Sequence, residues 1–447
     1  MINLIIFLII LGIMLYLMIK SKIGPFYCML LASIAIGFAC GLESSNTINT
    51  IVTGFSNTCK SIALLVIFGT VIGIYLERTN ACQRIAKTLL NFIGNSKSSI
   101  ALAITGFVIS IPVFCDVALV LLSPLIKSVA KRSGKNPCAL GTITACSLLS
   151  TNAYVAPTPA PLSVIAVLGL DIGVSILWGL PVAAFVTLCI WVFGEFYLGR
   201  KPDSWFTQLE EEKLKNLQDS IEDLNDNEMP SFLAAVIPIL LPIILILLSS
   251  IGGQFLPKDS SLLAILKFLG DKNISLAIGI VITFLLLAKF LPEDKQYTPL
   301  SDAFKIAGPI IFITAAGGSL AAIVNATGIG EFIVTILTAS HVPVILMPFL
   351  ITGFSKFAQG SASVAELLAA GLSLPMCEAG LLTPLEAFLS ISAGAAFGSH
   401  VNNSFFWVFS EFMGYDSKTT LKTLCVGQNI VMAFSGLFAA IIVSIII

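Results

Sequence analysis

The sequence predicts an all-α polytopic membrane protein made of two inverted-topology repeats with broken or re-entrant helical hairpins. Three observations support this fold class. First, 57% of the 447 residues are hydrophobic and only 11% are charged, whereas a soluble protein carries roughly 25% charged residues. Second, one long polar segment divides the chain into two apolar halves. Third, each half contains three polar, glycine-rich or proline-containing segments at membrane depth.

The apolar runs are the first element of this fold. They include MINLIIFLIILGIMLYLMI (1–19), FLAAVIPILLPIILILLSSIGG (232–253) and ISLAIGIVITFLLLA (274–288), which are typical of transmembrane helices. Lys20 and Lys22 follow the first run instead of preceding it, so we expect a retained helix and not a cleaved signal peptide. The net charge of −1 indicates no nucleic-acid partner, and ten single cysteines are expected to be small buried residues.

The polar segment Arg200–Pro230 predicts three parts: a first membrane repeat (1–199), a charged cytoplasmic linker (200–230) and a second, inverted repeat (231–447). Basic residues cluster after alternate helices of the first half, whereas the loop Glu43–Asn49 has none. The positive-inside rule then places both termini outside and the linker in the cytoplasm, with about seven crossings in the first half. We therefore expect a multi-pass protein of the cell (inner) membrane, with the lipid bilayer as its environment.

Two halves that each cross an odd number of times must have opposite orientations, as an inverted repeat requires. Short matches support this prediction. ITGF occurs at 104–107 and at 351–354, an offset of 247 residues. FGTVIGI (68–74) aligns with GGSLAAI (317–323), and Ser150 with Ser399, both at an offset of 249.

The polar segments occur in pairs. In the first half they are VIFGTVIG, SIPVFCDVALVLLSP and STNAYVAPTPAP; in the second they are TAAGGSLAA, SKFAQGSASVAELLAAG and FGSHVNNSFFW. An opened backbone cannot face lipid, so such segments must lie inside the protein or line a wet cavity, as in the binding sites of transporters. The N-termini of half-helices favour an anionic ligand. The expected helix-breaking residues are Pro157, Pro159, Pro161, Gly317 and Gly318.

Polar residues of these segments are the candidate site. The candidates for substrate binding are Thr151, Asn152, Thr158, Gln359, Ser361, Ser363, Asn402 and Asn403, and those for proton coupling are Asp116, His400 and Glu366. Intramembrane carboxylates usually line functional pathways, and histidine titrates near neutral pH. The alternatives are a structural hydrogen bond or a helix end near the interface for Asp116, and a structural role for His400. For Gln359, Ser361 and Ser363 the alternative is back-bonding to the helix or packing against a neighbour. Lys356 is interpreted as a cytoplasmic anchor whose side chain snorkels.

Four segments resemble the gluconate permease (GntP) family of the ion transporter superfamily. They are SIPVFCDVALVLLSPLIKSVAKRSGK, TNAYVAPTPAPLSVIAVLGLDIG, FAQGSASVAELLAAG and SHVNNSFFWVFSEFMGYDSKTTLKT. The resemblance implies proton-coupled uptake of small hydroxy acids such as gluconate, and in some members of D-serine. It also implies a scaffold and a mobile transport domain, in a homodimer that works by an elevator motion.

The chain departs from the family pattern at the site. Asn152 and Thr158 stand where the family has histidines, Asn403 where it has aspartate, and Asp116 where it has glutamate. The first hypothesis is therefore a secondary active transporter for a small anionic substrate, coupled to protons. The alternative is a carrier for D-serine or another small carboxylate, with Na⁺ coupling as a further alternative to proton coupling. A membrane enzyme and a passive channel are disfavoured, and we expect no catalytic residue, cofactor or metal site.

Overall fold

The computed structural model describes residues 2–20, 23–94, 97–208, 229–257, 259–328, 343–401 and 403–447. All regular elements in these ranges are helical, apart from an isolated antiparallel bridge between Gln208 and Tyr415. Seven helices of the described chain are long and apolar enough to cross a membrane: Ser44–Arg78, Pro137–Leu168, Ile172–Arg200, Phe232–Gly253, Lys272–Phe290, Glu293–Ala326 and Ser417–Ile446. The chain is a multi-pass membrane protein, as its composition predicts.

The first half consists of α1 (Ile2–Lys20), α2 (Pro25–Ala39), α3 (Ser44–Arg78), α4 (Ala81–Ile93), α5 (Ser98–Ile109), α6 (Cys115–Ser133), α7 (Pro137–Tyr154), α8 (Pro159–Leu168) and α9 (Ile172–Val192). The second half contains α11 (Phe232–Phe255), α12 (Ser261–Leu269), α13 (Lys272–Leu287), α14 (Thr298–Ala326), α16 (Leu346–Gln359), α17 (Ala362–Glu378), α18 (Pro384–Ala396), α19 (Ser404–Met413), α20 (Ser417–Thr420), the π-helices η8 (Leu421–Cys425) and η9 (Gly427–Met432), and α21 (Ala433–Ile446).

The beginning of the expected linker contacts the second half. The N–H of Asp416 donates to the Thr207 carbonyl (3.0 Å), and Lys422 Nζ donates to the Trp205 carbonyl (2.6 Å). Residues 209–228, the greater part of the linker, lie outside the described ranges.

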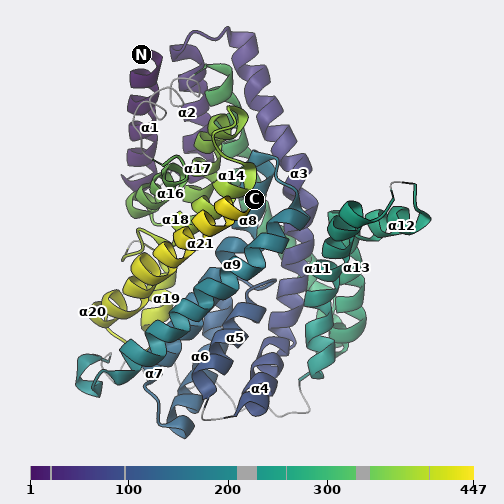
Figure 1. Ribbon diagram of the computed structural model, residues 1–447, viewed down its shortest axis with the longest axis vertical. Helices are drawn as coiled ribbons and strands as arrows, with labels where there is room; N and C mark the ends of the chain where they lie inside the picture. Colours follow the sequence, from purple (N-terminus) through teal and green to yellow (C-terminus); the bar gives the residue numbers. More distant parts are fainter. Residues whose placement is uncertain are drawn as a thin grey trace.

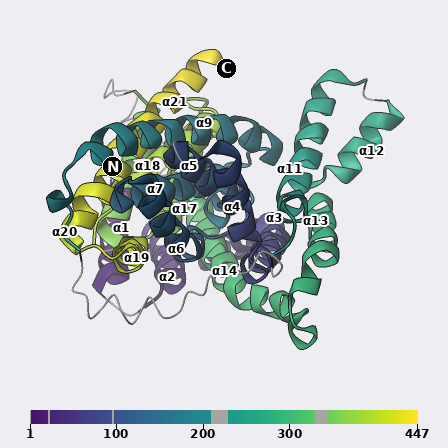
Figure 2. The ribbon, with the colours of Figure 1, turned by 90° about the horizontal axis from the view of Figure 1, so that it is seen from below.

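Helices α11, α12 and α13 project from one side of the molecule in both ribbon views (Figures 1 and 2). Helix α11 packs on α3, α4 and α9, α13 packs on α3, and α12 packs on α11 and α13. We call these three helices the arm; its outer surface is apolar. Exposed side chains there include Phe255 (80%), Phe268 (64%) and Leu285 (64%). Large exposed apolar surfaces are costly in water but match the hydrocarbon of a bilayer. We therefore expect the arm to face lipid.

Helices α3 and α14 run unbroken through the glycine segments, so the prediction of a helix break at Gly317 and Gly318 is wrong. The glycines instead let the two helices approach closely. A Cβ added to Gly318 would lie 2.0 Å from Thr58 Oγ1 and 2.9 Å from the Gly54 carbonyl oxygen. Small residues have this packing role in membrane helices, where backbones pass each other at short distance.

Replacement of Gly318 by leucine is expected to destabilise the protein. The side chain would overlap α3, and overpacking of this kind costs about 1–3 kcal/mol or more. Gly308→Leu is the matched control, because it lies on the same helix and a Cβ there meets no described atom within 4 Å. Thermal unfolding of detergent-solubilised protein measures the effect. Equal unfolding temperatures for the two variants would contradict this account of the crossing.

Four interruptions open the helices that surround the site. Residues 110–114 join α5 to α6 and residues 360–361 join α16 to α17, so that each pair forms a helical hairpin. Residues 155–158 separate α7 from α8, and residues 397–403 separate α18 from α19. Pro157 lies in the interruption after α7, while Pro159 and Pro161 lie in the first turn of α8. In the first turn of a helix the missing N–H of proline costs little free energy, because the first N–H groups of a helix have no intrahelical partner.

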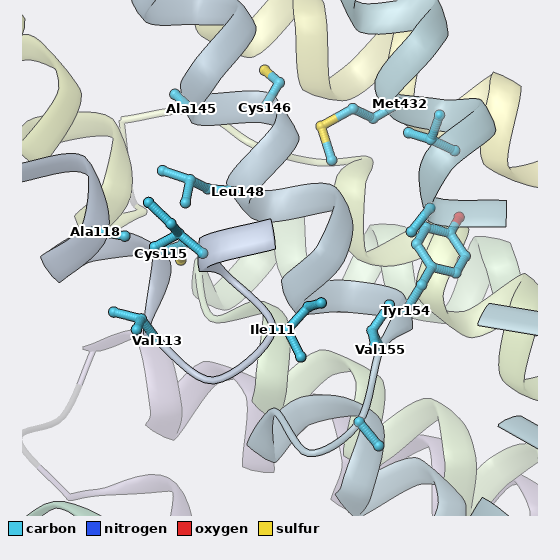
Figure 3. Packing of buried hydrophobic residues seen from close by; sticks show 14 of the residues in the cluster. Ile111, Val113, Cys115, Ala118, Ala145, Cys146, Leu148, Tyr154, Val155 and Met432 are labelled. Carbon is cyan, nitrogen blue, oxygen red and sulfur yellow. The ribbon is translucent and has the colours of Figure 1, made fainter. Parts of the chain in front are cut away.

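The tip of the first hairpin is part of the protein core. Figure 3 shows Ile111, Val113 and Cys115 at this tip and Leu148 on α7 as members of one buried cluster. All four are at most 8% exposed. The opened backbone thus lies inside protein, as a membrane requires.

Candidate substrate site

A cavity of about 490 Å³ lies where the interrupted helices meet. Both hairpins and both broken helices contribute to its wall. The lining residues include Cys115, Asp116, Asn152, Pro159, Lys356, Ser361, Ala362, Ser363, Glu366, Ala395, Asn403, Ser404 and Gln428. The described cavity therefore combines residues from the first and second halves of the chain.

Four helix N-termini line this cavity. They belong to α6 (Cys115), α8 (Pro159), α17 (Ala362) and α19 (Ser404). Each helix N-terminus carries a partial positive charge from its unbonded N–H groups and the aligned peptide dipoles. Their convergence in a low-dielectric setting favours an anion.

Side chains at two of these N-termini shape the wall. Ser361 Oγ accepts a hydrogen bond from the Val364 N–H (3.4 Å), and Asn403 Oδ1 accepts one from the Phe405 N–H (3.0 Å). Such N-caps fix the start of a helix. Both residues also line the cavity, so the sequence positions that begin α17 and α19 also present polar groups to this cavity.

Two carboxyl groups face the cavity. Asp116 lies in the first turn of α6 and is half-buried; its Oδ1 has no hydrogen-bond partner among the described residues. Its Oδ2 accepts a long contact from Cys115 Sγ (3.8 Å). Glu366 on α17 is 1% exposed, and its Oε2 also has no partner in the described chain. Unsatisfied buried carboxyl oxygens are costly and point to a ligand or a proton.

Lys356 lines the same cavity, and its interpretation as a snorkelling anchor is wrong. Its side chain is 2% exposed, and Nζ donates a hydrogen bond to the carbonyl of Ala395 in α18. The cavity thus contains an ammonium group inside the membrane-embedded part of the protein. The sequence signal is a lysine inside the apolar helix LMPFLITGFSKFAQ.

The structure brings six of the predicted site residues to the cavity: Asp116, Asn152, Ser361, Ser363, Glu366 and Asn403. Asn402 and the side chain of Gln359 lie outside the described residues.

Three other candidates form bonds within the protein. Thr151 Oγ1 donates to the Phe107 carbonyl (2.9 Å) and so ties α7 to α5. Thr158 Oγ1 donates to the carbonyls of Val155 (2.6 Å) and Asn152 (3.0 Å). His400 Nε2 pairs with the Phe357 carbonyl (2.9 Å). The contact of His400 fits its structural alternative, and the hydroxyls of Thr151 and Thr158 are occupied by backbone carbonyls.

Sequence reasoning missed a polar pair in η9, Gln428 and Asn429. Asn429 Nδ2 donates to the Ser399 carbonyl (2.8 Å), and the Ser399 N–H donates to Asn429 Oδ1 (2.8 Å). Ser399 Oγ also donates to Gln428 Oε1. The pair holds the interruption before α19, and its signal was the dipeptide GlnAsn inside the apolar span LCVGQNIVMAF.

Comparison with known proteins relates the chain to transporters. A family model described as GntP family permease matches residues 2–446. An uncharacterized permease of Haemophilus influenzae is 31% identical over 433 residues, which cover 95% of this chain and 89% of the relative. The high-affinity gluconate transporter of Escherichia coli is 26% identical, with 97% of both chains covered. The Gnt-II system L-idonate transporter of E. coli is 27% identical, with 96% of both chains covered.

Two solved structures share the fold. The YdaH transporter of Alcanivorax borkumensis has a TM-score of 0.62 at 14% identity, and the match covers 94% of this chain and 98% of that one. MtrF of Neisseria gonorrhoeae, described as illuminating a class of antimetabolite efflux pumps, has a TM-score of 0.65 at 14% identity, with 96% of both chains covered. At this identity the likeness concerns the fold alone.

Proposed function

Because the chain belongs to the GntP family of permeases, we propose that it imports a small hydroxy carboxylate, gluconate or a related sugar acid, together with protons. It is a gluconate-permease-type transporter and not an enzyme. The observation that carries the proposed substrate class is the convergence of four helix N-termini on one cavity.

The composition of the cavity suits both parts of such a substrate. The helix N-termini and the Lys356 ammonium provide positive charge for a carboxylate. Asn152, Ser363 and Asn403 offer amide and hydroxyl groups to substrate hydroxyls. A volume of about 490 Å³ lies within the range of roughly 300–1,000 Å³ that is typical of small-molecule sites.

An inverted repeat of residues 1–199 and 231–447 is supported by matching local structure. The order hairpin, broken helix, long C-terminal helix occurs in both halves. In the repeated ITGF segment, Thr105 donates to the carbonyl of Ala101 (2.8 Å) and Thr352 to that of Pro348 (2.7 Å). α5 packs on α7 as α16 packs on α18. We place the linker 200–230 in the cytoplasm and both termini outside.

An elevator mechanism assigns these elements to two domains. We propose that the hairpins and broken helices form the mobile transport domain, with the substrate held at its cavity. The arm α11–α13 and the long helices α3 and α14 would form the scaffold, through which a homodimer assembles. The extended lipid-facing surface of the arm supports a role outside the transport domain.

Uptake by purified protein in proteoliposomes tests the proposed function. Radiolabelled gluconate should accumulate when the vesicle interior is alkaline relative to the medium, and an excess of unlabelled sugar acid should compete. An imposed Na⁺ gradient at equal pH should drive no accumulation. Uptake driven by Na⁺ alone, or competition by D-serine but not by any sugar acid, would favour the alternative carrier over this proposal.

A further inference from the structure

The side chain of Lys356 ends at an unusual place for a lysine. Lys356 lies on α16, the first helix of the second hairpin, and its Nζ donates to the carbonyl of Ala395. Ala395 is in the last turn of α18, which ends at Ala396. The last carbonyls of a helix have no intrahelical N–H partner, and they form the negative end of the helix dipole. This end of α18 is therefore a place that favours a cation.

The surroundings offer further compensation for a positive charge. Glu366 of α17 is the carboxyl group that interacts electrostatically with the ammonium; the thiols of Cys115, Cys146 and Cys425 also lie nearby, but a protonated thiol adds no negative charge. Asp116 lines the same cavity. A buried charge is tolerated only where partners of this kind replace its water. The end of α18, with Ala395 and Ala396 in the cavity wall, places a helix C-terminus opposite in charge to the four helix N-termini of the same wall.

The two hairpins differ at this position. The repeated ITGF segment, with its offset of 247 residues, aligns Lys356 with Ile109 of the first hairpin. Ile109 is fully buried and apolar. Within the aligned segment, a charge at this position is a property of the second hairpin alone, so packing of the hairpin does not require it.

We propose that the Lys356 ammonium is a built-in cation, which occupies the C-terminal end of α18 in place of a soluble metal cation and provides positive charge for the substrate carboxylate. The inference rests on the proposed function of carboxylate transport. A covalently attached cation cannot dissociate with the substrate. Na⁺ is therefore neither needed at this position nor able to enter it in the wild-type protein.

Ligand-induced stabilisation tests the cation site without any substrate. Lys356→Ala removes the ammonium and leaves space beside the Ala395 carbonyl. Methylammonium or Na⁺ should then raise the unfolding temperature of Lys356→Ala by about 3 °C or more, because a ligand that binds only the folded state stabilises it. Neither cation should change the wild-type value. Lys267→Ala, an exposed residue of α12, is the matched control and should behave as wild type.

Transport in proteoliposomes provides the second readout. Uptake by Lys356→Ala should fall about a hundredfold and recover in part when methylammonium is added. Uptake within about threefold of wild type without any added cation would overturn the inference, as would the absence of both stabilisation and rescue in a folded variant. If Lys356→Ala does not fold, Lys356→Met, which keeps the length without the charge, should lose substrate binding; retained binding would also overturn the inference. The stabilisation result stands even if gluconate is not the substrate.

Discussion

Asp116→Asn is expected to abolish accumulation of substrate in response to a pH gradient while leaving substrate exchange across the membrane intact. Asp116 lines the cavity in the first turn of α6, and its Oδ1 has no partner among the described residues. A carboxyl group in this position can take up a proton from the cavity together with the substrate. Asparagine keeps the size and the hydrogen-bonding groups but cannot titrate. Loss of about 2.7 kcal/mol of coupling corresponds to about a hundredfold lower net uptake.

Measuring net uptake and exchange separately distinguishes a loss of proton coupling from a loss of substrate binding. Exchange of external label for internal substrate needs no net proton movement, so an intact cavity continues to support it. Asp116→Ala removes the polar group as well and should impair both. Glu411→Gln, on the exposed side of α19, is the control for loss of a carboxylate. Wild-type accumulation by Asp116→Asn in a pH gradient would show that another group carries the proton, with Glu366 as the remaining carboxyl group of the cavity.

The interruptions that build the site were predictable from local chemistry. Proline has no N–H and is tolerated in the first turn of a helix, so the series Pro157, Pro159, Pro161 marks the end of one helix and the start of the next. Ser361 and Asn403 are residue types that cap helix N-termini. Because half-helices in a membrane turn their opened ends inward, the sequence alone assigns the polar residues beside these interruptions to one cavity.

Other positions depend on partners that are distant in the sequence. A glycine pair in an apolar helix is compatible with a helix break or with a close crossing of two helices. The position of α3 beside Gly318 shows that α3 and α14 cross closely at this glycine. Lys356 has a side chain long enough to reach an interface or a carbonyl, and the C-terminus of α18 determines the outcome. The hydroxyl of Thr151 is bonded to α5, a helix separated from it by the whole of α6 in the sequence. Periodicity and composition contain no information on such neighbours.

Asn429→Ala is expected to raise the KM for uptake about tenfold or more, with a smaller change in kcat. The side-chain amide of Asn429 pairs with both the N–H and the carbonyl of Ser399. Loss of these two bonds leaves backbone groups unpaired in a buried place, at about 1–3 kcal/mol each. Ser399 lies four residues before Asn403, which caps α19 and lines the cavity. A loosened interruption therefore misplaces one of the four helix N-termini that line the cavity.

Graded variants separate this positioning role from general destabilisation. Asn429→Asp retains an acceptor for the Ser399 N–H but loses the donor to its carbonyl, so its KM should lie between those of wild type and Asn429→Ala. Ser435→Ala, whose hydroxyl donates to the Met432 carbonyl in the next part of the same helix, removes a hydrogen bond without touching the interruption and should leave KM unchanged. If Asn429→Ala lowers the unfolding temperature but binds substrate as wild type does, the amide serves the stability of the fold and the N-terminus of α19 is held by other contacts.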